Sequence, residues 1–136
     1  MKTSALAITL STVMSFICTY FFNLTMTYYE QYLALVAVVS LDGLFGIMAG
    51  IKREGFKTFK ALSILKTMFA WCLFLTVLLM VEQGFKGTSW LSETILIPFI
   101  VFQLISALKN ASMAGVIKKE NLNRILDKID KHKGNR

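Results

Sequence analysis

Four stretches of the chain are almost continuously apolar, and polar residues gather between them and at the end. The apolar stretches cover residues 4–24, 32–51, 61–81 and 92–108. An α-helix rises about 1.5 Å per residue, so a stretch of this length spans roughly 30 Å, the thickness of a bilayer's hydrocarbon core. The pattern predicts an all-α integral membrane protein, with about four transmembrane helices in a domain over residues 1–108.

The fourth stretch is the shortest and the least uniform. It contains Pro98 near its middle, and Gln103 and Ser106 in its second half. At the helical rise it reaches only about 25 Å, so a full crossing requires local bilayer thinning or side chains that reach the interface. A re-entrant or interfacial segment is the alternative expectation.

Basic residues divide the connections between the stretches into two kinds. The connections over residues 23–31 and 82–91 hold one basic residue between them, whereas Lys2, residues 52–60 and residues 109–136 hold most of the Lys and Arg. Basic connections favour the cytoplasmic side of a membrane. The alternation predicts a multi-pass membrane protein with both termini on the cytoplasmic side.

Residues 109–136 form a basic tail with a helical pattern of their own. Leu122, Ile125, Leu126 and Ile129 recur at the spacing of one helix face. We expect a short amphipathic basic helix in a cytoplasmic tail, which lies on the inner leaflet or packs against copies of itself.

Composition narrows the class of protein and its partners. Of the 136 residues, 55% are hydrophobic and the net charge is +7, which is too apolar for a soluble domain of this size. The basic clusters predict contact with anionic lipids of the inner leaflet or with a cytoplasmic protein; we expect no nucleic acid, because no aromatic–basic surface motif accompanies them. The expected contact residues are Lys52, Arg53, Lys57, Lys60, Lys118, Lys119 and Arg124.

Asp42 is the one acid inside a predicted span. A carboxylate at mid-depth costs about 2.5–3.5 kcal/mol on insertion scales, so it requires compensation. Lys66 is a candidate cation, although it stands nearer the inner end of its stretch than Asp42 does, and Gln103 is a third intramembrane polar residue. Three interpretations follow: structural pairing with Lys66 or with free backbone amides, polarity linked to assembly, and a proton- or ion-binding group.

Small residues form a stripe beside Asp42. Gly46 and Gly50 stand four residues apart, and Gly43 widens the stripe. Such a surface lets helix backbones approach closely, and it predicts helix packing or homo-oligomerisation. The partner is either a neighbouring segment or another copy of the chain.

Candidate chemistry is sparse. His132 lies in the polar tail, and Cys18 and Cys72 lie in different stretches without metal or disulfide spacing. No nucleophile–base pair, carboxylate pair or phosphate-binding loop can be assembled. We expect no enzymatic activity, no metal site and no cofactor.

Two motifs resemble the phage holin family, which includes the toxin-secretion holins of clostridia. The first is Leu-Asp-Gly-Leu-Phe-Gly at residues 41–46, followed by a Lys/Arg-bearing linker and a lysine that opens the next span. The second, Ser-Ala-Leu-Lys-Asn-Ala-Ser-Met-Ala-Gly-Val at residues 106–116, is similar to that family's Ser-x-Leu-Glu-Asn … Gly-Val motif. Lys109 replaces the acid of the second motif, Gln103 replaces an acid before it, and Ile117-Lys118 replace a proline pair.

The resemblance covers about residues 41–128 and implies a function. A holin would oligomerise in the bacterial inner membrane, form pores or larger lesions, and release an endolysin or toxin during host cell lysis. The residues themselves leave two other functions open. One is a non-lytic anchor or scaffold that docks a cytoplasmic partner through its basic tail, and the other is a small four-span transporter.

Overall fold

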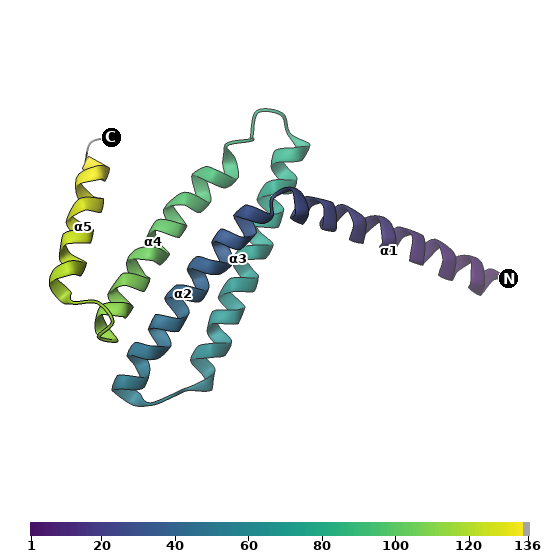
Figure 1. Cartoon of the computed structure of the whole chain (residues 1–136). Coiled ribbons are helices and arrows are strands. Elements are labelled where there is room, and N and C mark those ends of the chain that lie inside the picture. Colours follow the sequence, from purple (N-terminus) through teal and green to yellow (C-terminus); the bar gives the residue numbers. More distant parts are fainter. Residues whose placement is uncertain (135–136) are drawn as a thin grey trace.

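A computed structural model describes residues 1–134 as five helices joined by short connections (Figure 1). The helices are α1 Lys2–Thr27, α2 Tyr29–Glu54, α3 Thr58–Gly84, α4 Leu91–Met113 and α5 Lys119–Gly134. Within the described residues there is no strand, so the predicted all-α class is confirmed. The first four helices are long and apolar enough to cross a membrane.

Each of these four helices contains one predicted apolar stretch and extends beyond it, because flanking polar residues remain helical. The longest extension at a single end is that of α4, which continues through Pro98 and past Lys109 to Met113. Its 23 residues reach about 35 Å at the helical rise. The fourth stretch is therefore part of one continuous helix that is long and apolar enough to span a bilayer.

A glycine ends α4. Gly115 has φ of 82°, the left-handed region that glycine adopts without steric cost. The following Val116 N–H donates to the carbonyl of Ala111 at 2.9 Å, and Ala114 N–H donates to that of Asn110 at 2.8 Å. These bonds satisfy carbonyls at the helix end, as in a Schellman turn. The Gly-Val pair of the second motif is thus the stop signal of α4.

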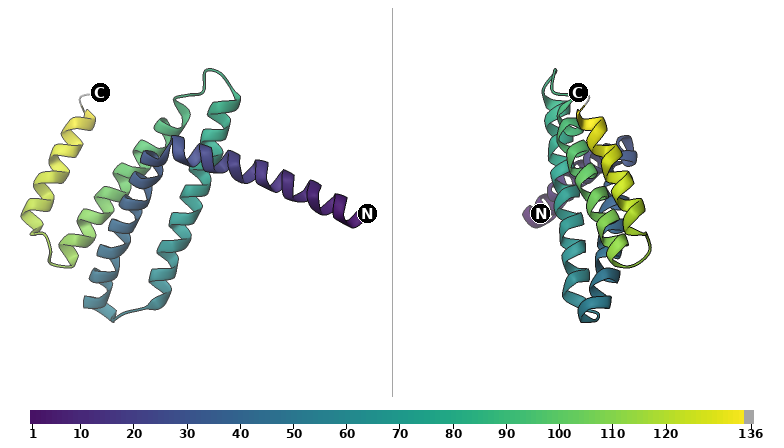
Figure 2. Two further views of the ribbon diagram at one scale, coloured as in Figure 1. Left: turned by 45° about the vertical axis from the view of Figure 1, so that its right-hand side comes forward. Right: turned by 90° about the vertical axis from the view of Figure 1, so that its left-hand side faces the viewer.

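Helix α1 extends away from the other helices in Figure 1 and in the left view of Figure 2. Only Tyr28 separates α1 from α2, so the expected connection over residues 23–31 is mostly helical. Leu24 is the one buried residue of α1, and Tyr20 Oη donates to Gln83 Oε1 on α3 at 3.4 Å. Contact with the rest of the chain is confined to the C-terminal part of α1.

Helices α2, α3 and α4 form the bundle, in which α2 packs against both of the others. The largest cluster of buried residues consists of Leu24, Leu35, Leu75, Leu79 and Leu96. Beside it, the rings of Trp71 and Phe99 stack with centroids 3.5 Å apart. This core lies toward the end of the bundle that carries the α3–α4 connection.

The two ends of the bundle differ in charge. The α2–α3 and α4–α5 connections lie at the same end, and the α3–α4 connection, which carries Lys86, lies at the other (Figure 1). The basic residues 52–60 and 118–119 therefore gather at one end. From that end α5 runs back beside α4 (Figures 1 and 2).

Candidate functional site

The acid of the first motif is bonded to the asparagine of the second. Asn110 Nδ2 on α4 donates a hydrogen bond of 2.9 Å to Asp42 Oδ1, halfway along α2, and both side chains are half-buried. A carboxylate gains more from such a bond than a neutral acceptor does, because the acceptor is charged. Asn110, rather than Lys66, is the intrachain partner of the acid.

Gly43, beside Asp42, gives room for the approach of α3, and Gly46 faces the Asn110 amide. A Cβ at Gly46 would meet Asn110 Nδ2 at 3.4 Å, and a Cβ at Gly43 would lie 2.6–2.7 Å from three side-chain carbons of Ile64 on α3. Real Cβ atoms essentially never come as close as 2.6 Å. The small-residue stripe of α2 is therefore used between helices of the same chain.

A polar notch of about 210 Å³ opens next to the hydrogen bond, between α2, α3 and α4. Its lining consists of Val39, Asp42, Gly43, Ser63, Ile64, Thr67 and Gln103. The structure thus brings two of the three predicted intramembrane polar residues, Asp42 and Gln103, to one site. The hydroxyls of Ser63 and Thr67 come from α3, and Thr67 Oγ1 also donates to the carbonyl of Ser63 at 3.0 Å.

Lys66 lies outside this site. Its side chain is exposed, it is absent from the lining of the polar notch, and within residues 1–134 it forms no ion pair. The intrachain pairing with Asp42 that the sequence suggested is not formed. A cation therefore remains on the outer surface of a helix that is long and apolar enough to span a bilayer.

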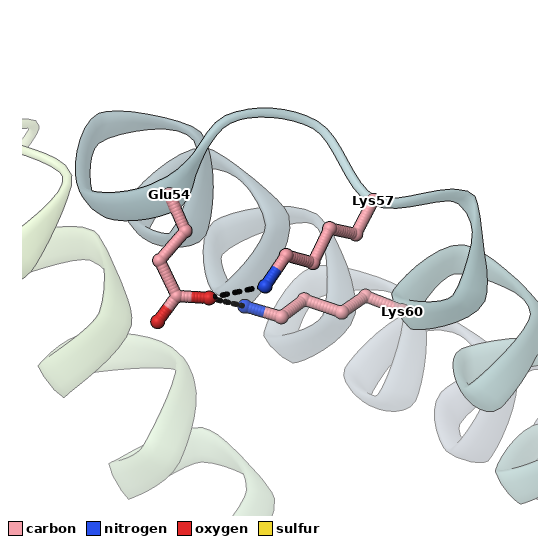
Figure 3. Close-up of polar contacts among 3 residues, drawn as sticks. All are labelled: Glu54, Lys57 and Lys60. Atoms are coloured by element: carbon pink, nitrogen blue, oxygen red, sulfur yellow. Dashed lines mark hydrogen bonds and ion pairs between the residues drawn. The ribbon is translucent and has the colours of Figure 1, made fainter.

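At the basic end of the bundle, the carboxylate of Glu54 interacts with two lysines, Lys57 and Lys60 (Figure 3). Glu54 Oε2 accepts a hydrogen bond from Lys57 Nζ at 2.8 Å and lies 3.9 Å from Lys60 Nζ. The hydrogen bond from Lys57 and the charges of Lys57 and Lys60 lower the pKa of the Glu54 carboxyl. All three side chains are exposed enough for this pairing to add little to stability.

Two lysines at this end, Lys60 and Lys52, lie against glycines. A Cβ at Gly50 would come 2.9 Å from Lys60 Nζ, and one at Gly115 would come 2.7 Å from Lys52 Nζ. Gly50, predicted as part of a packing stripe, therefore accommodates a lysine from the start of α3. The remaining basic residues of the expected contact set, Arg53, Lys118, Lys119 and Arg124, are exposed, and Arg124 pairs with Glu120 at 2.9 Å.

Helix α5 and α4 enclose an apolar groove of about 770 Å³. From α4 the groove is lined by Ile97, Pro98, Val101, Phe102 and Leu104, and from α5 by Ile125, Lys128, Ile129, His132 and Lys133. Lys133 Nζ lies 5.4 Å from the centroid of the Phe102 ring. The groove places the second half of α5 level with the middle of α4.

Three residues of this site were not among the predicted site residues. Asn110 was visible in the sequence as the asparagine of the second motif, and its position among apolar and small residues was the available signal. Ser63 and Thr67 gave no comparable signal, because hydroxyls in apolar helices usually bond to their own backbone, as that of Thr67 also does.

Comparison with known proteins gives one match. The family model described as "Bacteriophage holin family" matches residues 16–131. A search of curated proteins and a search of solved structures each found no match. The family match and the four apolar helices identify a multi-pass membrane protein. Because the matched region covers most of the sequence and includes both the Asp42 and the Asn110 motifs, the chain belongs to the bacteriophage holin family.

Proposed function

We propose that this protein acts as a holin: it accumulates in the bacterial inner membrane, assembles with copies of itself, and opens lesions that release an endolysin or toxin. The protein itself carries out no catalysis in this proposal. Family membership supports the general class. The position of α5 is the observation that carries the lesion-forming step.

Helix α5 has five basic and three acidic residues, yet it lies level with the apolar middle of α4. Each charge placed in hydrocarbon costs about 2.5–3.5 kcal/mol, so the free-energy cost of surrounding all of α5 with lipid at that depth would be prohibitive. Its apolar residues Ile125 and Ile129 face α4, and Lys128 and Lys133 line the groove beside them. The other charged side chains are exposed and lie outside the groove lining: Lys119, Glu120, Arg124, Asp127, Asp130 and Lys131. This arrangement suits the wall of a water-filled opening.

Polar groups on the bundle support a threshold for opening. Lys66 is exposed on α3, and Ser63 is exposed beside the polar notch. Such groups raise the free energy of the protein when they face lipid, and hydration lowers it when water reaches them. A small assembly would keep them in contact with neighbouring chains, and a large assembly would hydrate them in a lesion.

Before a lesion opens, we expect both termini and α5 on the cytoplasmic side; α5 reaches the depth of the middle of α4 only when it lines an opening. The basic connections gather at one end of the bundle, and such connections favour the cytoplasm. A reporter enzyme that is active only outside the cytoplasm should be silent when fused after Arg136 and active when inserted at Lys86. An active fusion after Arg136 contradicts this topology.

The functional test is expression of this chain alone in a bacterial host. After induction we expect normal growth for a lag, followed by abrupt loss of membrane potential and viability. Asp42→Asn preserves the size of the side chain and removes its charge, so the onset should shift while membrane insertion persists. Membrane potential, optical density and protein amount by immunoblotting are the measurements.

Glu93→Gln is the control, because it also neutralises a carboxylate, at an exposed position in the first turn of α4. Its onset should equal that of the original chain. Accumulation to high cell density with the potential intact contradicts the holin proposal and favours an anchor or scaffold. Killing with unaltered timing in Asp42→Asn removes only the role given to the acid.

A further inference from the structure

Asp42 and Lys66 lie at nearly the same depth in the bundle. Helices α2 and α3 run antiparallel, and the close approach of Gly43 to Ile64 places their sequence neighbours Asp42 and Lys66 at nearly the same level along the bundle. The polar notch also joins Asp42 to Ser63 and Thr67, which flank Lys66 in the sequence. A negative and a positive side chain therefore occupy one level of the same three-helix bundle.

The two charges face different directions. Successive residues of an α-helix are rotated by about 100°, so Lys66 points about 60° away from Ser63 and about 100° away from Thr67. These two neighbours line the polar notch, whereas Lys66 is exposed on the outer surface of α3. The lysine is thus presented to whatever lies beside the bundle.

Asp42 keeps capacity for a second partner. The bond from Asn110 uses Oδ1, and within residues 1–134 no hydrogen bond reaches Oδ2. Asp42 also lines the polar notch, whose volume of about 210 Å³ is sufficient for the end of a side chain. An ammonium group is compact and carries three donors, so it matches a carboxylate beside the Ser63 and Thr67 hydroxyls.

We propose that Lys66 of one copy enters the polar notch of a second copy and pairs there with Asp42. Copies inserted with the same topology share one depth, so the two levels coincide without any shift of the chains. Each charge would otherwise face hydrocarbon unpaired, which membrane helices avoid by pairing charges with one another. The occupant of the polar notch is therefore the lysine of an identical neighbour.

This contact has a consequence for assembly. The surface that carries Lys66 differs from the surface that carries the polar notch, so each copy uses one surface for each of two neighbours. Such head-to-tail contacts produce rings or open arrays rather than closed pairs. The inference rests on the proposed function only in that many copies share one membrane.

Crosslinking between two tagged forms of the full chain tests the contact. Cys18→Ser and Cys72→Ser remove the native thiols from both forms. One form carries Ser63→Cys in the polar notch, and the other carries Leu62→Cys, one turn from Lys66 on the exposed face of α3. A short bifunctional thiol reagent applied to membranes that contain both forms should yield a product with both tags.

In the crosslinked product one form supplies the polar notch and the other supplies Lys66, so each substitution can be compared with the same substitution in the other form. Asp42→Asn in the Ser63→Cys form should reduce the two-tag product roughly three- to twentyfold, the range expected for polar contacts between membrane helices. The same substitution in the Leu62→Cys form should leave the product unchanged. Lys66→Met should behave in the opposite way, reducing the product only when it is placed in the Leu62→Cys form.

Several outcomes overturn the proposal: no two-tag product, equal reductions in both placements, or no reduction in either. Carbonate-resistant membrane fractions from the same cultures confirm equal insertion, and the Lys66→Met series stands by itself if Asp42→Asn inserts poorly. Membrane potential is recorded in parallel. If the crosslinking depends on direction but the membrane stays polarised, the contact is supported and the holin proposal is contradicted. If the membrane depolarises but the crosslinking does not depend on Asp42 or Lys66, the holin proposal is supported and the contact is contradicted.

Discussion

Replacing Gly43 with valine should force α2 and α3 apart, destabilise the bundle and abolish killing of the host. A Cβ at this position already lies within 2.7 Å of three carbons of Ile64, and valine adds two further carbons. Overpacking of this kind costs about 1–3 kcal/mol, and more where neighbours cannot move. Ile64 is branched at Cβ and has few rotamers available in a helix. Thermal unfolding in detergent and limited proteolysis should both show the loss.

A compensating change identifies the cause. Ile64→Ala removes the three carbons that Gly43→Val would overlap, so the double variant conserves the number of side-chain carbons in the contact. Volume-conserving exchanges usually cost less than about 1.5 kcal/mol, and the double variant should therefore recover most of the stability. Gly84→Val is the control for glycine replacement itself, since a Cβ there has open space. Equal damage from Gly43→Val and Gly84→Val contradicts the packing argument.

Replacing Asn110 with leucine should also have a large effect. It removes the 2.9 Å hydrogen bond and leaves the Asp42 carboxylate without its donor. A buried group left without its partner typically costs about 1–3 kcal/mol, and more when it is charged. We expect a lower unfolding temperature in detergent and an earlier or abolished onset of killing.

The effect of Asn110→Leu should depend on the acid. In an Asp42→Leu background both polar partners are absent, and removal of both is close to neutral when the shape is kept. The double variant should therefore be more stable than the Asn110→Leu variant alone. If the two changes add, Asp42 and Asn110 contribute independently, and the bond between them is unimportant for stability.

The sequence predicted the helices well because a bilayer imposes a minimum apolar length, and the four helices inherit that length from continuous runs of apolar residues. It predicted helix ends less well. Polar residues such as Lys109 and Asn110 end an apolar stretch without ending a helix, whereas Gly115 ends α4 because its backbone can reverse there.

The partner of Asp42 was not predictable from local pattern. Charge alone pointed to Lys66, but an amide on α4 satisfies the carboxylate instead. That choice depends on how α2 and α4 pack, because their packing brings the Asn110 amide next to Asp42 and Gly46. Likewise, the stripe of Gly43, Gly46 and Gly50 predicted close approach, and only the three-dimensional arrangement shows that α3, α4 and Lys60 make it.

The bond between Asp42 and Asn110 can form only late in the synthesis of the protein. The two residues are 68 positions apart. A ribosome that adds roughly 5–20 residues per second would deliver Asn110 about 3–14 s after Asp42. During that interval α2 must enter the membrane on its apolar length alone, with its acid still lacking the amide. The arrival of α4 then completes the bundle, so a nascent chain gains its full set of polar contacts only near the end of translation.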